Sequence, residues 1–253
     1  MTVAPRVSIV IPARNEGRGV IAVLDRIKDS VGIPFEVIVV FDRPDDSTAP
    51  VLAEYGRDDP RFRGLVNGSG AGPAMAIRSG VGVAIADVVV VTMADGSDDV
   101  GLVDAMTRLV ERGCAVVAAS RYVPGGAQVG GEMIKARMSR TAGLLLYWFA
   151  RVGTHDATNS FKAYSRAFLE EVGIESDAGF EMGIEMVAKA RRLRRPVAEL
   201  PTIWLDRTEG QSNFKVRAWL PRYLRWFRYA FRPPTRGGSL ALRRQPATPE
   251  VGP

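Results

Sequence analysis

The segment 88–92 (VVVVT) is a continuous run of apolar and β-branched residues, and acids follow it directly in 93–99 (MADGSDD). Such a run indicates a strand buried on both faces, as in a parallel sheet covered by helices. Acids at its C-terminal end would lie where open α/β sheets bind ligands. Clustered carboxylates repel one another unless a cation joins them, and Mg²⁺ is commonly held by one or two carboxylates plus substrate phosphates. We therefore predict a metal–diphosphate site at Asp95, with Asp98 or Asp99 capping the next helix.

The overall composition is that of a globular protein with a proper core. The chain has 253 residues, of which 46% are hydrophobic, enough for one large domain or two small ones. Its single cysteine, Cys114, lies in an apolar run, which indicates a buried thiol rather than a nucleophile. The sequence starts without the pattern of a signal peptide, and no stretch approaches the roughly 18 apolar residues of a membrane span. We expect a cytoplasmic protein.

Positive charge is concentrated towards the C-terminus. The net charge of the chain is +6, but the residues from Lys189 onward contain 15 Lys or Arg and 4 Asp or Glu, a balance of +11. Within 219–232, aromatic and small residues at helical spacing alternate with arginines; they are Trp219, Tyr223, Trp226, Phe227 and Ala230. This composition is typical of a helix lying in a membrane interface, although the same stripe can pack on the protein's own core.

The rest of the chain alternates strand-like and helix-like patterns. The predicted strands are 7–11, 35–41, 63–66, 88–92, 115–119, 197–200 and 202–205. The predicted helices are 19–30, 48–55, 72–86, 100–112, 134–152, 166–172 and 180–192. This order implies an α/β fold with a largely parallel sheet and crossover helices. We expect one domain over 1–215, an amphipathic helix over 216–232 and a disordered tail over 233–253.

Polar loops follow the first three predicted strands. They are 12–16 (PARNE), 42–48 (DRPDDST) and the glycine-rich 67–73 (NGSGAGP). If the strands that begin at residues 7, 35 and 88 are parallel neighbours, these loops share one rim with Asp95, where a nucleotide could bind. Glycines before a helix allow close approach of a phosphate. Each loop can also be ordinary turn or capping sequence, and neither a P-loop nor a G-x-G-x-x-G motif is present.

In the order and spacing of these motifs, the chain resembles the inverting family 2 glycosyltransferases of the GT-A fold, and among them the polyprenyl phosphate sugar transferases. The resemblance covers roughly residues 6–215. The segments that carry it are 12–16, 42–48, 68–80, 93–99, 120–126 (SRYVPGG), 156–162 (DATNSFK), 179–185 (GFEMGIE) and 206–215 (DRTEGQSNFK).

The resemblance implies a single Rossmann-like sheet flanked by helices, a nucleoside-diphosphate sugar donor and Mg²⁺ or Mn²⁺ as cofactor. The residues it implies for nucleotide binding are Pro12, Ala13, Asn15, Glu16, Asp42, Gly68, Ala71, Ala94 and Asp95. Asp95 and Ser97 would hold the metal. The family commonly has Asp-x-Asp at this point, and here Met93 replaces the first acid. A cation can still bind through one protein carboxylate and the diphosphate.

A lipid phosphate acceptor would need no general base, because its oxygen is already anionic. The chain has one histidine, His155, and so few groups suited to that role at neutral pH. The acceptor would instead need cations, for which the candidates are Arg121, Arg137, Lys162, Arg207 and Lys215. Asp95, Arg121 and Arg207 are the residues that we expect to be catalytic. Such an enzyme would act at the cytoplasmic face of a membrane.

Other functions fit parts of the sequence. A family 2 transferase with a saccharide or other alcohol acceptor would need a base, for which Asp156, Glu181 and Glu185 are the candidates. The single acid at the metal motif also suits a sugar-nucleotide-binding protein with weak catalysis. The basic C-terminal part suits nucleic acid, which we favour least and do not expect as a partner. The sequence leaves open the sugar, the nucleotide and the oligomeric state, and both GDP-mannose and UDP-glucose are compatible donors.

Overall fold

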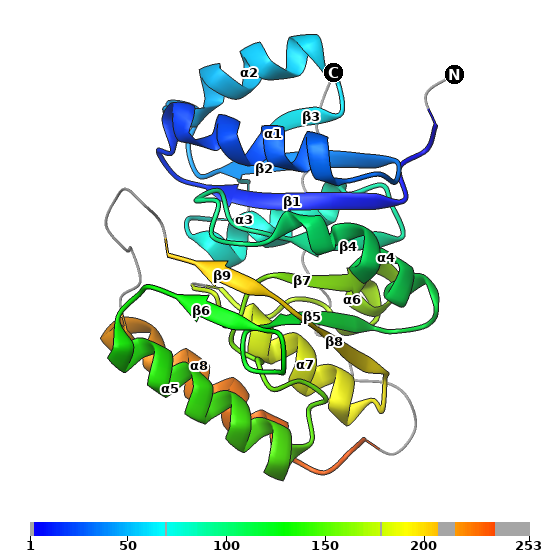
Figure 1. Cartoon of the computed structure of the whole chain (residues 1–253), viewed down its shortest axis with the longest axis vertical. Coiled ribbons are helices and arrows are strands. Elements are labelled where there is room, and N and C mark those ends of the chain that lie inside the picture. The colour runs from blue at the N-terminus through cyan, green and yellow to red at the C-terminus, as the bar shows by residue number, and fades with distance from the viewer. Residues whose placement is uncertain (1–2, 69, 178, 207–215, 236–253) are drawn as a thin grey trace.

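The computed structural model describes residues 3–68, 70–177, 179–206 and 216–235. Within them, one sheet has seven strands in the order β3-β2-β1-β4-β7-β5-β8, and only β7 runs antiparallel to its neighbours (Figure 1). The strands are β1 (Val7–Ala13), β2 (Phe35–Phe41), β3 (Phe62–Val66), β4 (Val88–Val91), β5 (Val116–Ser120), β7 (Lys162–Ser165) and β8 (Val197–Pro201). The predicted α/β fold with a mostly parallel sheet is therefore confirmed.

Helices cover both faces of this sheet. The helices of the described residues are α1 (Val20–Ser30), α2 (Thr48–Asp58), α3 (Pro73–Val83), α4 (Val103–Glu111), α5 (Met133–Leu145), α6 (Arg166–Val172), α7 (Met182–Arg192) and α8 (Val216–Ala230). In β2, Val37 and Val39 pack with α1, α2 and α4, whereas Ile38 and Val40 pack on the opposite side with α3. Burial on both faces explains why the central strands are apolar without alternation.

The parallel strands β1, β2 and β4 end at one rim of the sheet. β1 pairs with β2 from Val7 to Ala13, and with β4 from Val7 to Val10. The chain proceeds outward from β1 to β2 and β3, and then returns to place β4 on the other side of β1. Open α/β sheets bind ligands at such a reversal of strand order. The loops after β1 and β4 lie on either side of it, as predicted for a shared rim.

A second, two-stranded sheet lies beside the C-terminal end of the main one. It pairs β6 (Ala127–Val129) in parallel with β9 (Ile203–Leu205). The helix predicted over 134–152 is α5, which continues into a single π-helical segment, η3 (Leu146–Ala150). None of the helices in the described part of the chain has the length and apolar character needed to cross a bilayer.

The aromatic stripe of α8 faces the protein interior. Trp226 is 2% exposed and Ala230 is buried, and Tyr223 and Phe227 are partly buried against the same core cluster. The ammonium nitrogen of Lys189 on α7 lies 5.2 Å from the centre of the Trp226 ring. These residues thus adopt the core-packing alternative. Residues 207–215 and 236–253, which include most of the predicted tail, lie outside the described residues, as does the side chain of Trp219.

Candidate active site

The loops after β1 and β2 are held together by hydrogen bonds. The backbone N–H of Asn15 donates to Asp46 Oδ2 at 2.9 Å, and Thr48 Oγ1 accepts from the N–H of Glu16 at 3.1 Å. Asn15 has φ 55°, a left-handed conformation that asparagine tolerates better than most residues. Pro12 and Ala13 are the last two residues of β1 rather than part of the loop. The predicted nucleotide residues of this strand end therefore have fixed positions at the rim.

Asp42 connects the end of β2 to the glycine-rich loop. Its Oδ1 accepts from Asn67 Nδ2 at 3.0 Å, and its Oδ2 accepts from the backbone N–H of Gly72 at 3.1 Å. Gly72 has φ 109°, in the region that favours glycine, and it directly precedes α3. These contacts bring the exposed Gly68 and Ala71 to the same rim as Asp42. The rim thus carries the nucleotide candidates of three separate segments.

The loop after β4 presents Asp95 at the same rim. Asp95 is half-buried, and its Oδ1 accepts from the backbone N–H of Ser97 at 3.1 Å. Ala94 and Ser97 are buried on either side of it. The carbonyl oxygen of Ser97 accepts from the N–H of Leu205 at the end of β9. Asp95 is therefore the half-buried acid of this loop at the rim, and its carboxylate is positioned by the backbone N–H of Ser97, whose own side chain is buried.

The other two acids of the loop have structural partners. Asp99 accepts from the N–H of Gly101 at 3.2 Å and caps the short 3₁₀ helix η2 (Val100–Leu102), as expected for one of the pair. Asp98 is 3% exposed and accepts from Thr92 Oγ1 at 2.9 Å and from the N–H of Met93 at 3.1 Å. Burial raises the pKa of Asp98 to about 6, against the lowering effect of the Thr92 hydrogen bond.

Replacing Asp98 with asparagine should stabilise the metal-free protein at neutral pH. The folded-state pKa is about 6 and the ordinary value is 3.8, so the wild-type protein loses stability as pH rises from about 4 to about 6. At 1.36 kcal/mol per pKa unit this loss is roughly 3 kcal/mol. An asparagine side chain keeps an oxygen for Thr92 and Met93 but cannot ionise. The free energy of unfolding of both proteins is measured with urea in EDTA at pH 4 and pH 7. If the wild-type protein loses no more stability than the variant between these pH values, the prediction is wrong.

The donor set suits a cation shared with a diphosphate. Among the residues that the structure describes, no three His, Cys, Asp or Glu side chains are arranged to hold a metal ion together. The β4 loop contributes the half-buried carboxylate of Asp95, whereas Asp42 at the same rim already accepts from Asn67 and Gly72. Mg²⁺ keeps several waters and is commonly bound by one or two carboxylates with substrate phosphates, so one carboxylate is sufficient only when the phosphates supply the other ligands.

Arg121, at the end of β5, forms a buried ion pair with Asp156. Its Nε donates to Asp156 Oδ2 at 2.7 Å and its Nη2 to Oδ1 at 2.9 Å, a two-pronged contact with a completely buried carboxylate. Although burial opposes it, the hydrogen bonds and charge of Arg121 hold the pKa of Asp156 below its usual value. Nη2 also donates to Ser139 Oγ on α5 at 3.2 Å. The guanidinium is therefore locked in place.

A basic cavity of about 610 Å³ lies between the segment after β5 and helix α5. Its lining includes Arg121, Tyr122, Gln128, Arg137 and Arg140, and no acid. The structure thus brings the predicted Arg121 and Arg137 to one cavity. Arg140 was missed, although it follows Arg137 by three residues and so shares its side of the helix.

Of the other predicted phosphate ligands, only Lys162 is described by the structure, and it does not line this cavity. Lys162 is buried in β7, where its ammonium donates to the carbonyl oxygens of Asp156, Ala157 and Asn159. Burial lowers the pKa of Lys162 to about 8. A phosphate contact by Lys162 would require the 156–159 loop to move. Arg207 and Lys215 lie outside the described residues, so their predicted contacts stay predictions.

The three carboxylates considered as general bases are all buried. Asp156 is paired with Arg121, as described above. Glu181 accepts from the N–H of Gly179 at 2.8 Å. Glu185 accepts from Lys189 Nζ at 2.6 Å and from the Ser176 N–H at 2.8 Å. None of these three faces the basic cavity as an available proton acceptor.

Comparison with known proteins identifies relatives along most of the chain. A sequence profile described as "Glycosyl transferase family 2" matches residues 8–173. A polyprenol monophosphomannose synthase from Mycolicibacterium smegmatis is 28% identical over 236 residues, which cover 86% of this chain and 89% of the relative. An undecaprenyl-phosphate mannosyltransferase from Micrococcus luteus is 27% identical over 216 residues, which cover 82% of this chain and 87% of the relative.

Solved structures share the fold at lower sequence identity. Glucosyl-3-phosphoglycerate synthase from Mycobacterium tuberculosis, in complex with Mn²⁺, UDP and glucosyl-3-phosphoglycerate, has a TM-score of 0.67 at 17% identity and covers 92% of this chain and 82% of its own. A mannosyltransferase from Pyrobaculum calidifontis, in complex with GDP-Man and Mn²⁺, has a TM-score of 0.60 at 18% identity. The match covers 89% of this chain and 64% of the mannosyltransferase. These likenesses confirm the GT-A fold.

Proposed function

Since the chain belongs to glycosyl transferase family 2 and is a glycosyltransferase, we propose that it transfers a hexose from a nucleoside-diphosphate sugar to a polyprenyl phosphate. The observation that carries this proposal is the basic cavity, which has three arginines and no acid in its lining. An anionic acceptor matches that charge. Mannose is the first sugar to test, because both relatives compared above are named for mannose transfer.

On the donor side, the rim formed by the ends of β1, β2 and β4 would bind the nucleotide. Asn15 and Glu16 flank the reversal of strand order, and Asp42 with the glycine-rich loop borders it on the β2 side. Asp95 would hold Mg²⁺ or Mn²⁺ against the diphosphate. When bound, the metal would stabilise negative charge on the departing nucleoside diphosphate.

On the acceptor side, Arg137 and Arg140 would bind the lipid phosphate and aim one of its oxygens at the anomeric carbon. That oxygen is already anionic at neutral pH, so no proton has to be removed before it attacks. The burial of Asp156, Glu181 and Glu185 suits this mechanism and disfavours an alcohol acceptor, which needs a base. Arg121 lines the same cavity and, held by Asp156, can offer a guanidinium edge in a fixed orientation. Arg207 and Lys215 remain further proposed phosphate ligands.

A sugar-nucleotide panel tests the proposal. GDP-mannose, UDP-glucose and related donors are incubated with a short-chain polyprenyl phosphate, with Mg²⁺, Mn²⁺ or EDTA, and the lipid product is separated by chromatography. We expect metal-dependent transfer from one donor. Transfer to free saccharides but not to the lipid phosphate would identify a saccharide as the acceptor. Donor binding without any transfer would identify a sugar-nucleotide-binding protein instead.

Removing one arginine of the cavity should weaken acceptor use selectively. Arg137→Ala or Arg140→Ala should raise the KM for polyprenyl phosphate about tenfold, the loss of roughly 1.4 kcal/mol expected of a charge-assisted contact. The KM for the sugar nucleotide should stay unchanged. Arg57→Ala, an exposed arginine on α2 at the opposite end of the molecule, is the matched control (Figure 1). Equal effects on both KM values would place these arginines at the donor instead.

A further inference from the structure

Helix α5 and segment η3 expose an unusual number of large apolar side chains. Ile134, Phe149 and Trp148 are 74%, 72% and 66% exposed. The full set of exposed apolar residues on these two elements is Met133, Ile134, Met138, Leu145, Trp148 and Phe149. Single exposed apolar residues are ordinary, but a cluster of this kind marks an interaction surface.

The π-helical segment holds its two exposed aromatic residues rigidly. Leu146 and Ala150, at its ends, are fully buried. Between them, the Tyr147 ring stacks on His155 with centroids 3.6 Å apart, and His155 Nδ1 lies 2.6 Å from Glu199 Oε1. Tyr147 therefore anchors η3 against His155, the Trp148 ring meets the Tyr147 ring edge-on at 5.2 Å, and Trp148 and Phe149 remain exposed.

The end of α5 is in equally close contact with the body of the protein. A side chain at Gly143 would overlap the carbonyl oxygen of His155, so the backbones of the helix and the 153–156 loop are in direct contact. The exposed surface is consequently part of a fixed element, and ordering it for binding requires little loss of conformational entropy.

Charge identifies the kind of partner. The sequence from 133 to 154 contains Lys135, Arg137, Arg140 and Arg151 and no Asp or Glu. A second copy of the chain related by two-fold symmetry would place this basic face against itself, with like charges opposed. Anionic lipid headgroups over an apolar layer match both the arginines and the exposed aromatic residues.

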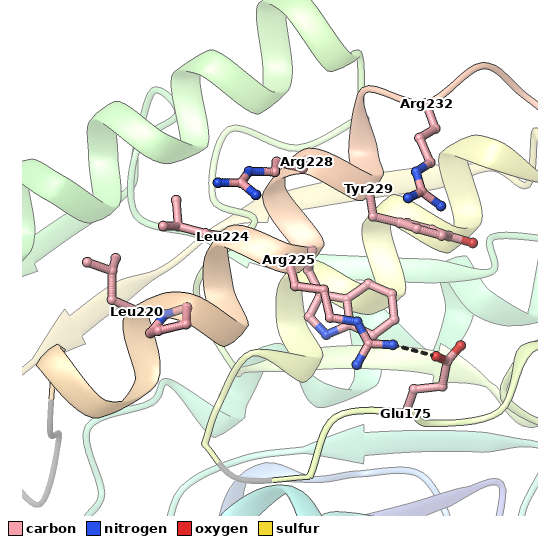
Figure 2. Close-up of a pocket in the computed structure, with 9 residues that line it drawn as sticks. Glu175, Leu220, Leu224, Arg225, Arg228, Tyr229 and Arg232 are labelled. Carbon is pink, nitrogen blue, oxygen red and sulfur yellow. Dashed lines mark hydrogen bonds and ion pairs between the residues drawn. The ribbon is translucent and has the colours of Figure 1, made fainter.

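Helix α8 extends this surface. Leu220 and Leu224 are exposed on it and Phe231 directly after it, and α8 contacts η3. Figure 2 shows Leu220, Leu224 and Arg228 in a row along the helix, bordering a groove of about 710 Å³, whereas Arg225 turns to Glu175 at 2.9 Å. α5 and α8 lie at the end of the molecule opposite α2 (Figure 1).

We propose that α5 and η3, with the outer side of α8, form the face that inserts into an anionic lipid surface. The role of this face rests on the proposed function, in which Arg137 and Arg140 of the same helix α5 bind the acceptor phosphate in the basic cavity. A lipid phosphate can then enter the cavity while its hydrocarbon chain stays in the membrane. Trp226 and Ala230 of α8 are buried in the protein core and are not part of the exposed apolar surface.

Vesicle binding tests the surface directly. Full-length protein is sedimented with phosphatidylcholine vesicles that contain phosphatidylglycerol. The double variant Trp148→Ser/Phe149→Ser should partition to vesicles at least tenfold less than wild type, with an unchanged melting temperature. Ile85→Ser, which removes an apolar side chain of 63% exposure outside this surface, should bind like wild type. Equal binding by the double variant, or no binding by wild type, would overturn the assignment.

Two further measurements separate the possible failures. Light scattering reports the oligomeric state, and a wild-type dimer that the double variant converts to monomer would assign the surface to a second copy instead. Turnover of a short-chain polyprenyl phosphate in solution should be the same in wild type and double variant, whereas turnover of a long-chain acceptor in vesicles should fall. Absence of short-chain turnover in wild type would refute the proposed function alone, because vesicle binding is measured without substrates.

Discussion

Replacing Asp95 with asparagine should lower metal-dependent sugar transfer at least a hundredfold and leave the fold intact. Asparagine keeps the size of the side chain and an oxygen for the Ser97 N–H, which Asp95 Oδ1 accepts at 3.1 Å. It removes the one carboxylate that the β4 loop directs to the rim. A hundredfold loss corresponds to about 2.7 kcal/mol of transition-state stabilisation. Initial rates across Mg²⁺ and Mn²⁺ titrations, together with the melting temperature, measure it.

Asp98→Asn is the matched comparison for this experiment. The two acids are three residues apart in one loop, but Asp98 is buried against Thr92 and Met93. Its replacement should reduce turnover less than that of Asp95. Unchanged activity of the Asp95 variant over the whole metal titration would remove Asp95 from the metal site. A reversed order of the two effects would assign the metal to Asp98.

Replacing Asp156 with asparagine should destabilise the fold strongly. Its carboxylate is completely buried and accepts two side-chain hydrogen bonds from Arg121, at 2.7 and 2.9 Å. Breaking a buried ion pair from one side leaves the other charge without compensation and typically costs about 3–5 kcal/mol. Urea unfolding at neutral pH should show a loss of this size. Because Arg121 lines the basic cavity, the KM for the acceptor should rise as well.

An exposed pair of similar geometry provides the control. Arg43 contacts Asp45 through Nε and Nη2, both at 2.7 Å, but both side chains are exposed. Asp45→Asn should leave the unfolding free energy unchanged, because solvent already screens that pair. Similar losses in the two variants would show that geometry, rather than burial, determines the contribution of these ion pairs.

The central sheet, and the rim at which β1, β2 and β4 end, could be predicted from short stretches of sequence. A strand covered on both faces has to be apolar along its length, as β4 is, and acids can begin only where the chain leaves the sheet. The polar loops after β1 and β2 were placed at the same rim from the strand pattern, and the family resemblance named the nucleotide candidates within them. Local composition was sufficient here because a strand that is buried on both faces has consecutive apolar residues.

Antiparallel β7 and short β6 were not predicted. β7 has four residues and inserts between β4 and β5, which precede it in the chain by about 40 to 70 residues. Strand pairing over such distances depends on partners that no local pattern identifies. This is also why Lys162, predicted to bind phosphate, instead lies inside the sheet with its ammonium bound to three carbonyl oxygens.

By itself, the sequence determined the fold class, the family resemblance and the acid at the end of β4, because these depend on residue type and spacing along the chain. Only the tertiary structure decided the partner of each charged or aromatic side chain. Arg121 meets Asp156 from 35 residues away, and α7 buries Trp226 of α8. The exposed apolar face is therefore on α5 and η3. The sequence around an arginine or tryptophan can be the same in a salt bridge, a core or a lipid interface. Its neighbours in space determine which of these environments it occupies.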